Sequence, residues 1–442
     1  MSQKQHHLLK LLGLGFGIAI TVGGTIGTGI LRKPGLIASM IGNPWMILLL
    51  WLVVGIYAFL GVLCVIELSV SMPQAGSWYV YARRAFGDYI GFVTGITSWL
   101  GTVAALGFGA YTFSEYVALI IPETDTMLRV IAIGLLLLLM VFHLFGTKVS
   151  GYSQEVITVT NAISLLIFVG ICFVFGQAPT AQAVRNTVES TSGSITIIGV
   201  ITSLQAIFYT YDGWHTASYF TEENTDPSKT LPKSMKTGVI LIITMYLLIN
   251  SAILYVLPMD LLTQSKLAAA DTITYIFGPG YGKLITIFLM VSILSITNAQ
   301  IMFAPRIIYS MGRDNLFFKI STIVNLKGNP YLATLITVSL SVLLILSGKD
   351  TCSILSDIAT FFFVMSYIAG FAALIQMRYK EPELDRPYKA PMFPVLPYIL
   401  IAVSCLFLVG AVYSDLNSSK YALIFLAVSY PVYKLIKEIR KS

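Results

Sequence analysis

Charged side chains are scarce in this sequence. Only 11% of the 442 residues are Asp, Glu, Lys or Arg, whereas 56% are hydrophobic. A soluble domain carries about 25% charged residues. The shortage therefore excludes an ordinary soluble globular protein. The net charge of +7 does not require a nucleic-acid partner, because the positions of the Lys and Arg residues explain it, as described below.

Cysteines and catalytic motifs are also scarce. The four cysteines are Cys64, Cys172, Cys352 and Cys405. No two of them have the spacing of metal ligands, so we expect neither a metal site nor a disulfide framework. The sequence lacks a GxxxxGK[ST] motif, which argues against an ATP-driven pump. A membrane enzyme such as an acyl transferase needs a catalytic His or paired carboxylates at one membrane face. His6 and His7 lie in the N-terminal tail and His143 is isolated, so we expect no enzyme and no cofactor.

Long apolar runs follow one another along the whole chain. Each is long enough to cross the hydrocarbon core of a bilayer as a helix. We place about twelve spans, near residues 11–40, 46–70, 90–121, 128–146, 153–176, 195–220, 237–258, 282–311, 330–347, 351–377, 393–413 and 420–436. The first run is not followed by a small-residue cleavage site, so we interpret it as a retained helix and not as a signal peptide. The sequence therefore predicts an all-α polytopic membrane protein.

The basic residues are distributed unevenly between these spans. If the N-terminus lies inside, most of the 28 Lys and Arg residues fall in segments on the inner side. Cytoplasmic segments of membrane proteins carry this excess of positive charge. We therefore expect both termini to be cytoplasmic, with the protein in the inner or plasma membrane of the cell.

Two of the apolar runs are interrupted where an ordinary membrane helix would continue. The interruptions are Gly23–Gly29 (GGTIGTG) and Tyr209–His215 (YTYDGWH). Unpaired backbone is costly in lipid unless it lines a cavity or is covered by protein. Interrupted spans at corresponding positions of two halves indicate the midplane site of a secondary transporter. We therefore expect one transporter domain with inverted five-helix repeats, about 11–176 and 195–378, and an extra helix pair, about 393–436.

The interruptions suit a particular kind of ligand. A broken helix exposes free amides at the start of its second half and free carbonyls at the end of its first half, each end carrying about half a charge. A free amino acid has a carboxylate that fits amides after Gly27 and an ammonium that fits carbonyls before the breaks. Close helix packing is the alternative explanation for the glycines. The presence of a second break favours the substrate site.

Several segments resemble the amino acid–polyamine–organocation superfamily, and the resemblance covers essentially the whole chain. The segments are Gly23–Leu31, which resembles the first-helix motif, Met72–Tyr79 with Phe86-Gly87, which resembles the loop after helix 2, and Arg306–Asp314, which resembles the end of helix 8. Tyr209–Trp214, followed by Thr221-Glu222-Glu223, resembles the helix-6 signature of the L-type amino acid transporter branch and is the most specific match.

The resemblance implies the leucine-transporter fold, in which helices 1 and 6 are unwound around the substrate. At matching positions, Thr28 and Gly29 would hold the substrate carboxylate. Four backbone carbonyls would hold the ammonium, those of Thr25, Ile26, Tyr209 and Asp212. The full set of expected substrate-binding residues is Thr25, Ile26, Gly27, Thr28, Gly29, Tyr209, Tyr211, Asp212, Gly213 and His215. Tyr209 occupies the position of the aromatic residue that shields the substrate.

Two of these residues have more than one interpretation. Asp212 is an ionisable group at membrane depth, and such groups are usually functional. It could attract an ammonium group or carry a proton, but a cap on the second half of helix 6 is the favoured role. His215 stands where the branch often has a residue that reads the substrate side chain. A hydrogen bond to a neighbouring helix is an equal alternative for His215.

The sequence departs from the family pattern at Asn161. Many relatives place a lysine there, beside helix 1, and a neutral amide cannot supply its charge or bind its proton. With Ser292, Ser295 and Thr297, Asn161 could form an oxygen-rich coupling site, although ordinary interhelical hydrogen bonding is the alternative. Eukaryotic members of the branch also carry a cysteine between helices 3 and 4 that links a glycoprotein subunit. The loop Pro122–Leu128 has none, so we expect no disulfide-linked heavy subunit.

These observations together predict a secondary transporter of amino acids that works by alternating access. Thr28 and the small residues Gly107, Gly109 and Ala110 offer no fixed charge pair for an acidic side chain, so we expect small to medium neutral L-amino acids. A transporter of cationic amino acids or polyamines is an alternative because of Asp212, and a non-transporting amino acid sensor is another. Exchange is favoured over sodium or proton coupling, because no carboxylate falls near the predicted coupling site.

Overall fold

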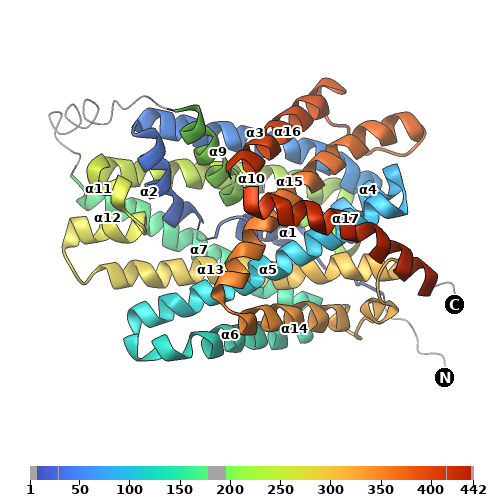
Figure 1. The fold of residues 1–442 in the computed structure, drawn as a ribbon, viewed down its shortest axis with the longest axis horizontal. Coiled ribbons are helices and arrows are strands. Elements are labelled where there is room, and N and C mark those ends of the chain that lie inside the picture. Colours follow the sequence, from blue (N-terminus) through green and yellow to red (C-terminus); the bar gives the residue numbers. More distant parts are fainter. Residues whose placement is uncertain (1–6, 28, 178–195, 415, 440–442) are drawn as a thin grey trace.

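In the computed structural model the chain is folded into helices (Figure 1), and the structure describes residues 7–27, 29–177, 196–414 and 416–439. Eight helices of the described part are long and apolar enough to cross a bilayer. They are α3 (Pro44–Ser71), α5 (Asp88–Ile120), η1 with α6 (Pro122–Met127 and Leu128–Leu144), α7 (Thr147–Phe175), α10 (Pro227–Val256), α13 (Gly282–Arg313), α15 (Lys349–Lys380) and α16 (Val395–Ser414). The prediction of an all-α polytopic membrane protein is confirmed.

The remaining four predicted spans are less regular. They are the broken pair α1 (Leu14–Gly23) and α2 (Gly29–Ile41), the broken pair α9 (Ile197–Tyr211) and η2 (Thr216–Glu223), the shorter helix α14 (Tyr331–Ser347), and α17 (Leu416–Ile439). Together with the eight long helices they account for the twelve predicted spans. Connections contain α4 (Trp78–Phe86), α11 (Met259–Gln264), α12 (Ala268–Phe277) and η3 (Lys319–Thr322). The division into repeats 11–176 and 195–378 with an extra pair at 393–436 stays a prediction.

The largest departure from a predicted boundary is at the start of α10. We expected this span to begin near residue 237, but α10 begins earlier, at Pro227. The side chain of Asp226 caps this helix by accepting a hydrogen bond from the amide of Lys229 at 3.3 Å, and Pro227 follows directly. An acidic N-cap followed by proline is a start signal for a helix. Hydropathy missed it because the first turns of α10 are polar.

The helices run mainly between two ends of the molecule (Figure 1). In this view α6 and α14 lie side by side along the lower edge, α3 and α16 lie along the upper edge, and α1 is central. The two ends of the described chain, at residues 7 and 439, lie at the right-hand end, with α4 and η3. We call this end, formed by residues 7–13, α4, η3 and the end of α17, the terminal face. The connection helices α11 and α12 lie at the opposite end.

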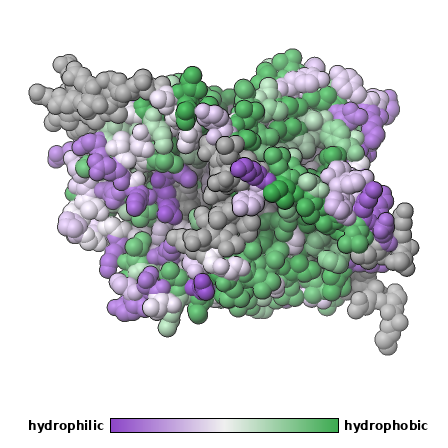
Figure 2. Space-filling model, in the orientation of Figure 1, coloured by the Kyte–Doolittle hydropathy of each residue, from purple (hydrophilic) through white to green (hydrophobic). Residues whose placement is uncertain are grey.

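Burial separates inner helices from outer ones. In the most apolar stretches of α3 and α5, 67% and 72% of the residues are buried, whereas in η1–α6 and α16 only 28% are buried. Hydrophobic residues cover much of the surface between the two ends in Figure 2, and hydrophilic residues gather toward the ends. Exposed apolar side chains on the outer helices are suited to contact lipid tails. The inner helices therefore enclose the two breaks.

Candidate functional site

The first break lies between α1 and α2. Near its end α1 still has a helical hydrogen bond, from the amide of Ile26 to the carbonyl of Val22 at 2.8 Å. The next helix starts at Gly29, and the first amides of an α-helix have no partner within that helix. Thr28, which we expected to bind the substrate carboxylate, lies outside the described residues. The break therefore places the amide end of α2 after the carbonyl end of α1.

The second break lies between α9 and η2. The chain leaves the helix at Asp212, and Gly213 has a φ of +109°, a conformation that L side chains rarely adopt. The helical direction resumes where the amide of Thr216 donates to the carbonyl of Gly213 at 2.9 Å. The second half of this span is a 3-10 helix that ends at Glu223. Glycine at position 213 is thus required by the local backbone.

Glycines bring the two breaks into direct contact. A Cβ atom on Gly213 would lie only 2.1 Å from the carbonyl oxygen of Gly24, so the two backbones touch. A Cβ on Gly24 would lie 2.7 Å from the hydroxyl of Thr216. On Gly29 it would lie 2.7 Å from the hydroxyl of Thr210 on α9. The missing side chain of Gly29 therefore makes room for a neighbouring helix, which is the packing role that the sequence left as the alternative.

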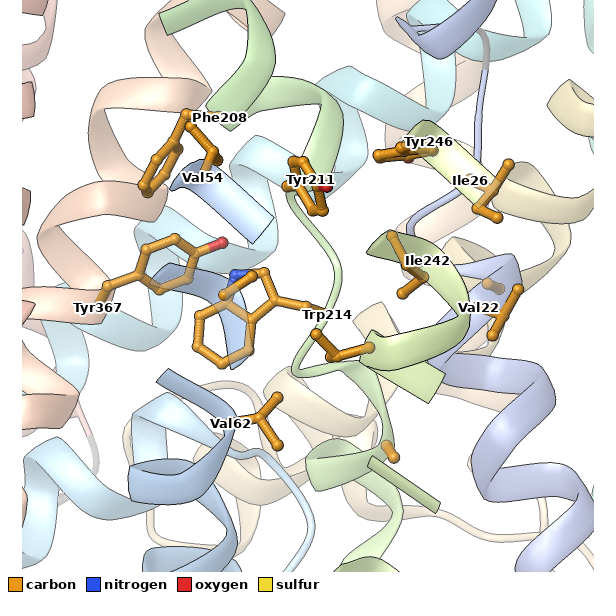
Figure 3. Packing of buried hydrophobic residues seen from close by; sticks show 14 of the residues in the cluster. Val22, Ile26, Val54, Val62, Phe208, Tyr211, Trp214, Ile242, Tyr246 and Tyr367 are labelled. Atoms are coloured by element: carbon orange, nitrogen blue, oxygen red, sulfur yellow. The ribbon is translucent and has the colours of Figure 1, made fainter. Parts of the chain in front are cut away.

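A residue that the sequence analysis missed ties the breaks together. The hydroxyl of Tyr246 on α10 lies 3.1 Å from the carbonyl oxygen of Thr25 and 2.8 Å from that of Thr210. Tyr246 is fully buried, and its ring packs against Tyr211 with 4.8 Å between centroids (Figure 3). Its single hydroxyl proton is shared between one carbonyl of each broken helix. Nothing distinguished this tyrosine in the sequence, because it lies within an ordinary apolar run.

The expected substrate residues of the first break are held by protein contacts. The hydroxyl of Thr25 donates to the carbonyl of Thr21 at 2.8 Å, so only its backbone is available to a ligand. The side chain of Ile26 is buried, and its carbonyl accepts a hydrogen bond from the amide nitrogen of Asn161 at 3.5 Å. A Cβ on Gly27 would lie 3.1 Å from Ile296 of α13. The backbone of this break therefore lies between α10, α7 and α13.

The side chains of the second break contact different helices. The hydroxyl of Tyr211 donates to the carbonyl of Trp51 at 3.2 Å, which directs this side chain toward α3. The ring of Tyr209 is partly exposed and lies 6.0 Å from the ammonium of Lys33 on α2. Asp212 accepts a hydrogen bond from the hydroxyl of Tyr367 on α15. The Asp212 carboxylate therefore joins the end of α9 to α15. Its favoured role as a cap on the second half of the broken helix stays a prediction.

His215 is packed among aromatic rings. It is buried, and its ring centroid lies 5.1 Å from that of Trp78, 5.2 Å from that of Trp214 and 5.4 Å from that of Tyr367. Figure 3 shows Trp214 and Tyr367 side by side at the second break, with 5.3 Å between their centroids. This placement favours a packing role for His215, between the break and the terminal face.

The four expected coupling residues do not form one cluster. The hydroxyl of Ser292 donates to the side-chain oxygen of Asn161 at 2.6 Å, and the amide nitrogen of Asn161 faces the carbonyl of Ile26. Ser295 lies one turn further along α13. Thr297 faces α5, where its hydroxyl would lie 3.3 Å from a Cβ on Gly109, and this hydroxyl has no hydrogen-bond partner among the described residues. The five-residue offset between Ser292 and Thr297 puts them on different sides of α13.

A second polar cluster joins α1, α7 and α13. The amide of Asn298 donates to the side-chain oxygen of Gln154 at 2.7 Å, and the nitrogen of Gln154 donates to Thr158 at 3.0 Å. The hydroxyl of Thr158 in turn donates to the carbonyl of Ala19 on α1 at 3.1 Å and lies 3.5 Å from that of Ser295. Polar residues inside membrane helices are a signal that could have found Gln154 and Thr158 from sequence.

Two ion pairs at the terminal face join η2, the second half of the broken span, to α13. Glu223, at the end of η2, is fully buried and binds Arg306 of α13 through two hydrogen bonds, of 2.9 and 3.0 Å. The carbonyl of Glu223 accepts hydrogen bonds from the amides of Leu11 and Leu12, both at 3.0 Å. Its neighbour Glu222 binds Arg313 at 2.8 Å. The segment before α1 is therefore fixed to the end of the second broken span.

Comparison with known proteins identifies this architecture. The sequence model described as amino acid permease matches residues 16–432. The chain belongs to this family. It is 28% identical over 451 residues to the serine/threonine exchanger SteT of Bacillus subtilis, with all of both chains covered. It is 27% identical to the b(0,+)-type amino acid transporter 1 of Mus musculus, covering 93% of this chain and 84% of the relative.

A third relative is named for other substrates. The cystine/glutamate transporter of Homo sapiens is 26% identical over 447 residues, covering 98% of this chain and 86% of the relative. The permease family confirms three expectations: the chain resembles the amino acid–polyamine–organocation superfamily, it is a multi-pass membrane protein for amino acid transport, and it is not an enzyme. Among the described residues, no group of three His, Cys, Asp or Glu side chains could hold a metal ion.

Proposed function

We propose that this permease exchanges small to medium neutral L-amino acids across a cell membrane by alternating access. The observation that carries the proposal is the direct contact between the two helix breaks, where Gly213 meets the carbonyl of Gly24. This contact, and the close approach of Gly29 to Thr210, support a site between the amide end of α2 and the carbonyl ends of α1 and α9. A zwitterionic backbone is complementary to this pair of opposite partial charges.

The proposed substrate class rests on Asp212 and on one relative. Because the carboxylate of Asp212 already accepts a hydrogen bond from Tyr367, it is a poorer partner for a cationic side chain than a free carboxylate. The serine/threonine exchanger SteT matches the whole chain, and its substrates are small and neutral. These two points favour neutral amino acids over the cationic or polyamine alternative.

Exchange without an ion gradient is proposed because of Asn161. This residue is neutral, and its side-chain oxygen is occupied by Ser292. A sodium ion at this position would find no carboxylate among the contacts of Asn161 and Ser292. The same contacts include no basic side chain that could bind a proton. We therefore propose that binding of a second amino acid, and not an ion, drives the return step.

The proposed orientation rests on the distribution of charge. We propose that the terminal face is cytoplasmic, since most Lys and Arg residues lie in segments on the side of the termini. We also propose that the protein works without a disulfide-linked heavy subunit, because the connection formed by η1 contains no cysteine.

Counterflow in proteoliposomes tests the proposal. Liposomes that contain the purified protein and unlabelled serine should accumulate labelled serine transiently, and threonine, alanine and leucine should compete. Uptake should not depend on external sodium or pH when these are varied separately. Preferential competition by arginine or a polyamine would support the cationic alternative, and binding without counterflow would identify a sensor. Accumulation driven by a sodium or proton gradient would refute exchange.

A further inference from the structure

Trp78 occupies the space between the second break and the terminal face. It is the first residue of α4, a helix bounded by Gly76 at a φ of +112° and Gly87 at +92°. Trp78, Tyr81 and Ala85 share one buried face of α4, as the helical spacing of three and four residues requires. The buried face of α4 therefore points into the protein, toward the helix breaks.

The indole of Trp78 fits a slot made by other segments. A Cβ on Gly370 of α15 would lie 2.1 Å from the indole, so only glycine leaves room for it. The centroid of the indole lies 5.1 Å from that of His215, 5.3 Å from that of Tyr367 and 6.0 Å from that of Trp214. Two of these rings belong to the second break itself. Trp78 thus covers the break from the side of the terminal face.

Ring packing holds Trp78 in place. The indole nitrogen of Trp78 and the Nδ1 atom of His215 are buried and have no hydrogen-bond partner among the described residues. Withdrawal of the indole therefore breaks no hydrogen bond of these two groups. Ser77, the residue before α4, is one contact of this segment with η2, since the hydroxyls of Ser77 and Ser218 lie 2.5 Å apart.

A cleft lies on the other side of α4. It has a volume of about 370 Å³ and is lined by Gln74, Val80, Arg83, Arg84, Asp88 and Asp314. Arg83 and Arg84 stand on the face of α4 that is not directed toward the second break, where they pair with Asp314 at 2.9 Å and Glu381 at 2.7 Å. The single helix α4 thus separates the cleft from the aromatic rings of the second break.

We propose that Trp78 is the barrier between the helix breaks and this cleft, and that its withdrawal opens the route to the terminal face. The inference rests on the proposed function, because alternating access requires such a barrier on each side. Trp78 touches the second break from outside the broken helices. Removal of the indole leaves an opening beside α4, between the second break and the terminal face, while the backbone of both breaks stays in place.

Thiol accessibility tests the barrier without any knowledge of the substrate. In a protein with its four cysteines replaced, His215→Cys reports access to the space behind the indole. A membrane-impermeant maleimide is applied from the terminal face. We expect Trp78→Ala to raise the labelling rate about tenfold or more. Gly370→Ala, which displaces the indole without removing it, should raise the rate in the same direction. Trp78→Phe should stay near the parent rate.

The matched control is Trp99→Ala. Trp99 is also buried, but its indole nitrogen donates to Thr337 of α14 at 3.0 Å, away from both breaks. Equal labelling rates in Trp78→Ala and Trp99→Ala would overturn the proposal, as would an unchanged rate in Gly370→Ala if Trp78→Ala does not fold.

A transport measurement gives the second readout. Release of preloaded serine into substrate-free medium should rise in Trp78→Ala relative to exchange, and this ratio should be unchanged in Trp99→Ala. If the ratio is the same in both variants, the barrier is not the step that limits release and the proposal fails. If the parent protein exchanges no amino acid but labelling still rises in Trp78→Ala, the proposed function fails and the barrier stands.

Discussion

Removal of one oxygen atom, in Tyr246→Phe, tests whether the two breaks act as one site. The hydroxyl of Tyr246 lies 3.1 Å from the carbonyl of Thr25 and 2.8 Å from that of Thr210. Phenylalanine keeps the ring and its contacts with Trp51 and Tyr211. The variant therefore removes the polar link between the broken helices and leaves the packing of α10 nearly unchanged.

The expected magnitude follows from burial. One proton serves two acceptors, so the substitution leaves one buried carbonyl without its donor at any moment, a loss that costs about 1–3 kcal/mol. Since 1.4 kcal/mol corresponds to about a tenfold change in an equilibrium constant, kcat/KM for exchange should fall about 5- to 150-fold. We expect this free-energy cost to lower kcat/KM because the Tyr246 hydroxyl joins the two breaks that form the proposed substrate site.

The assay is initial-rate exchange in proteoliposomes, with the amount of folded protein measured in parallel. Tyr255→Phe is the matched control, because Tyr255 lies on the same helix, is 37% exposed and packs on Phe173 of α7. It should keep the parent kcat/KM within about twofold, as surface substitutions usually do. A parent-like value for Tyr246→Phe, or an equal loss in both variants, would refute the reasoning.

Three further predictions concern the breaks, the ion pairs and coupling. Gly213→Ala should abolish exchange, because the added Cβ would lie 2.1 Å from the carbonyl oxygen of Gly24. The control Gly278→Ala should retain exchange, because Gly278 also has a positive φ, of +91°, but has open space around it. Equal losses in the two variants would contradict the contact between the breaks. Glu223→Gln, which breaks a buried pair, should cost about 3–5 kcal/mol and lower the unfolding temperature in detergent. The partly exposed pair of Glu222 should cost about 0–1 kcal/mol in Glu222→Gln, and the reverse order would be inconsistent with the burial of Glu223. Asn161→Lys should make exchange sensitive to external pH, since it adds a titratable group beside helix 1, and a flat pH profile for this variant would argue against a coupling role for the position.

The sequence alone determined the class of the protein and the location of its irregular backbone. Hydropathy predicts membrane helices because each helix satisfies its own backbone hydrogen bonds, a condition that depends only on local sequence. For the same reason Gly23–Gly29 and Tyr209–His215 were recognisable as breaks. Pro227, by contrast, needed a cap signal and not hydropathy, and its helix start was missed.

The tertiary structure decided which residues meet. Asp212 could have been a cap or a ligand from its position in the chain, and its partner, Tyr367, lies 155 residues away. Gly29 faces Thr210 and Thr297 faces Gly109 for a similar reason, since the rotation and tilt of each helix set the direction of every side chain. These angles come from packing among many helices, and no local pattern encodes them. Sequence thus located the breaks, whereas only the packed helices showed that the breaks touch, that Tyr246 joins them and that Trp78 covers one of them.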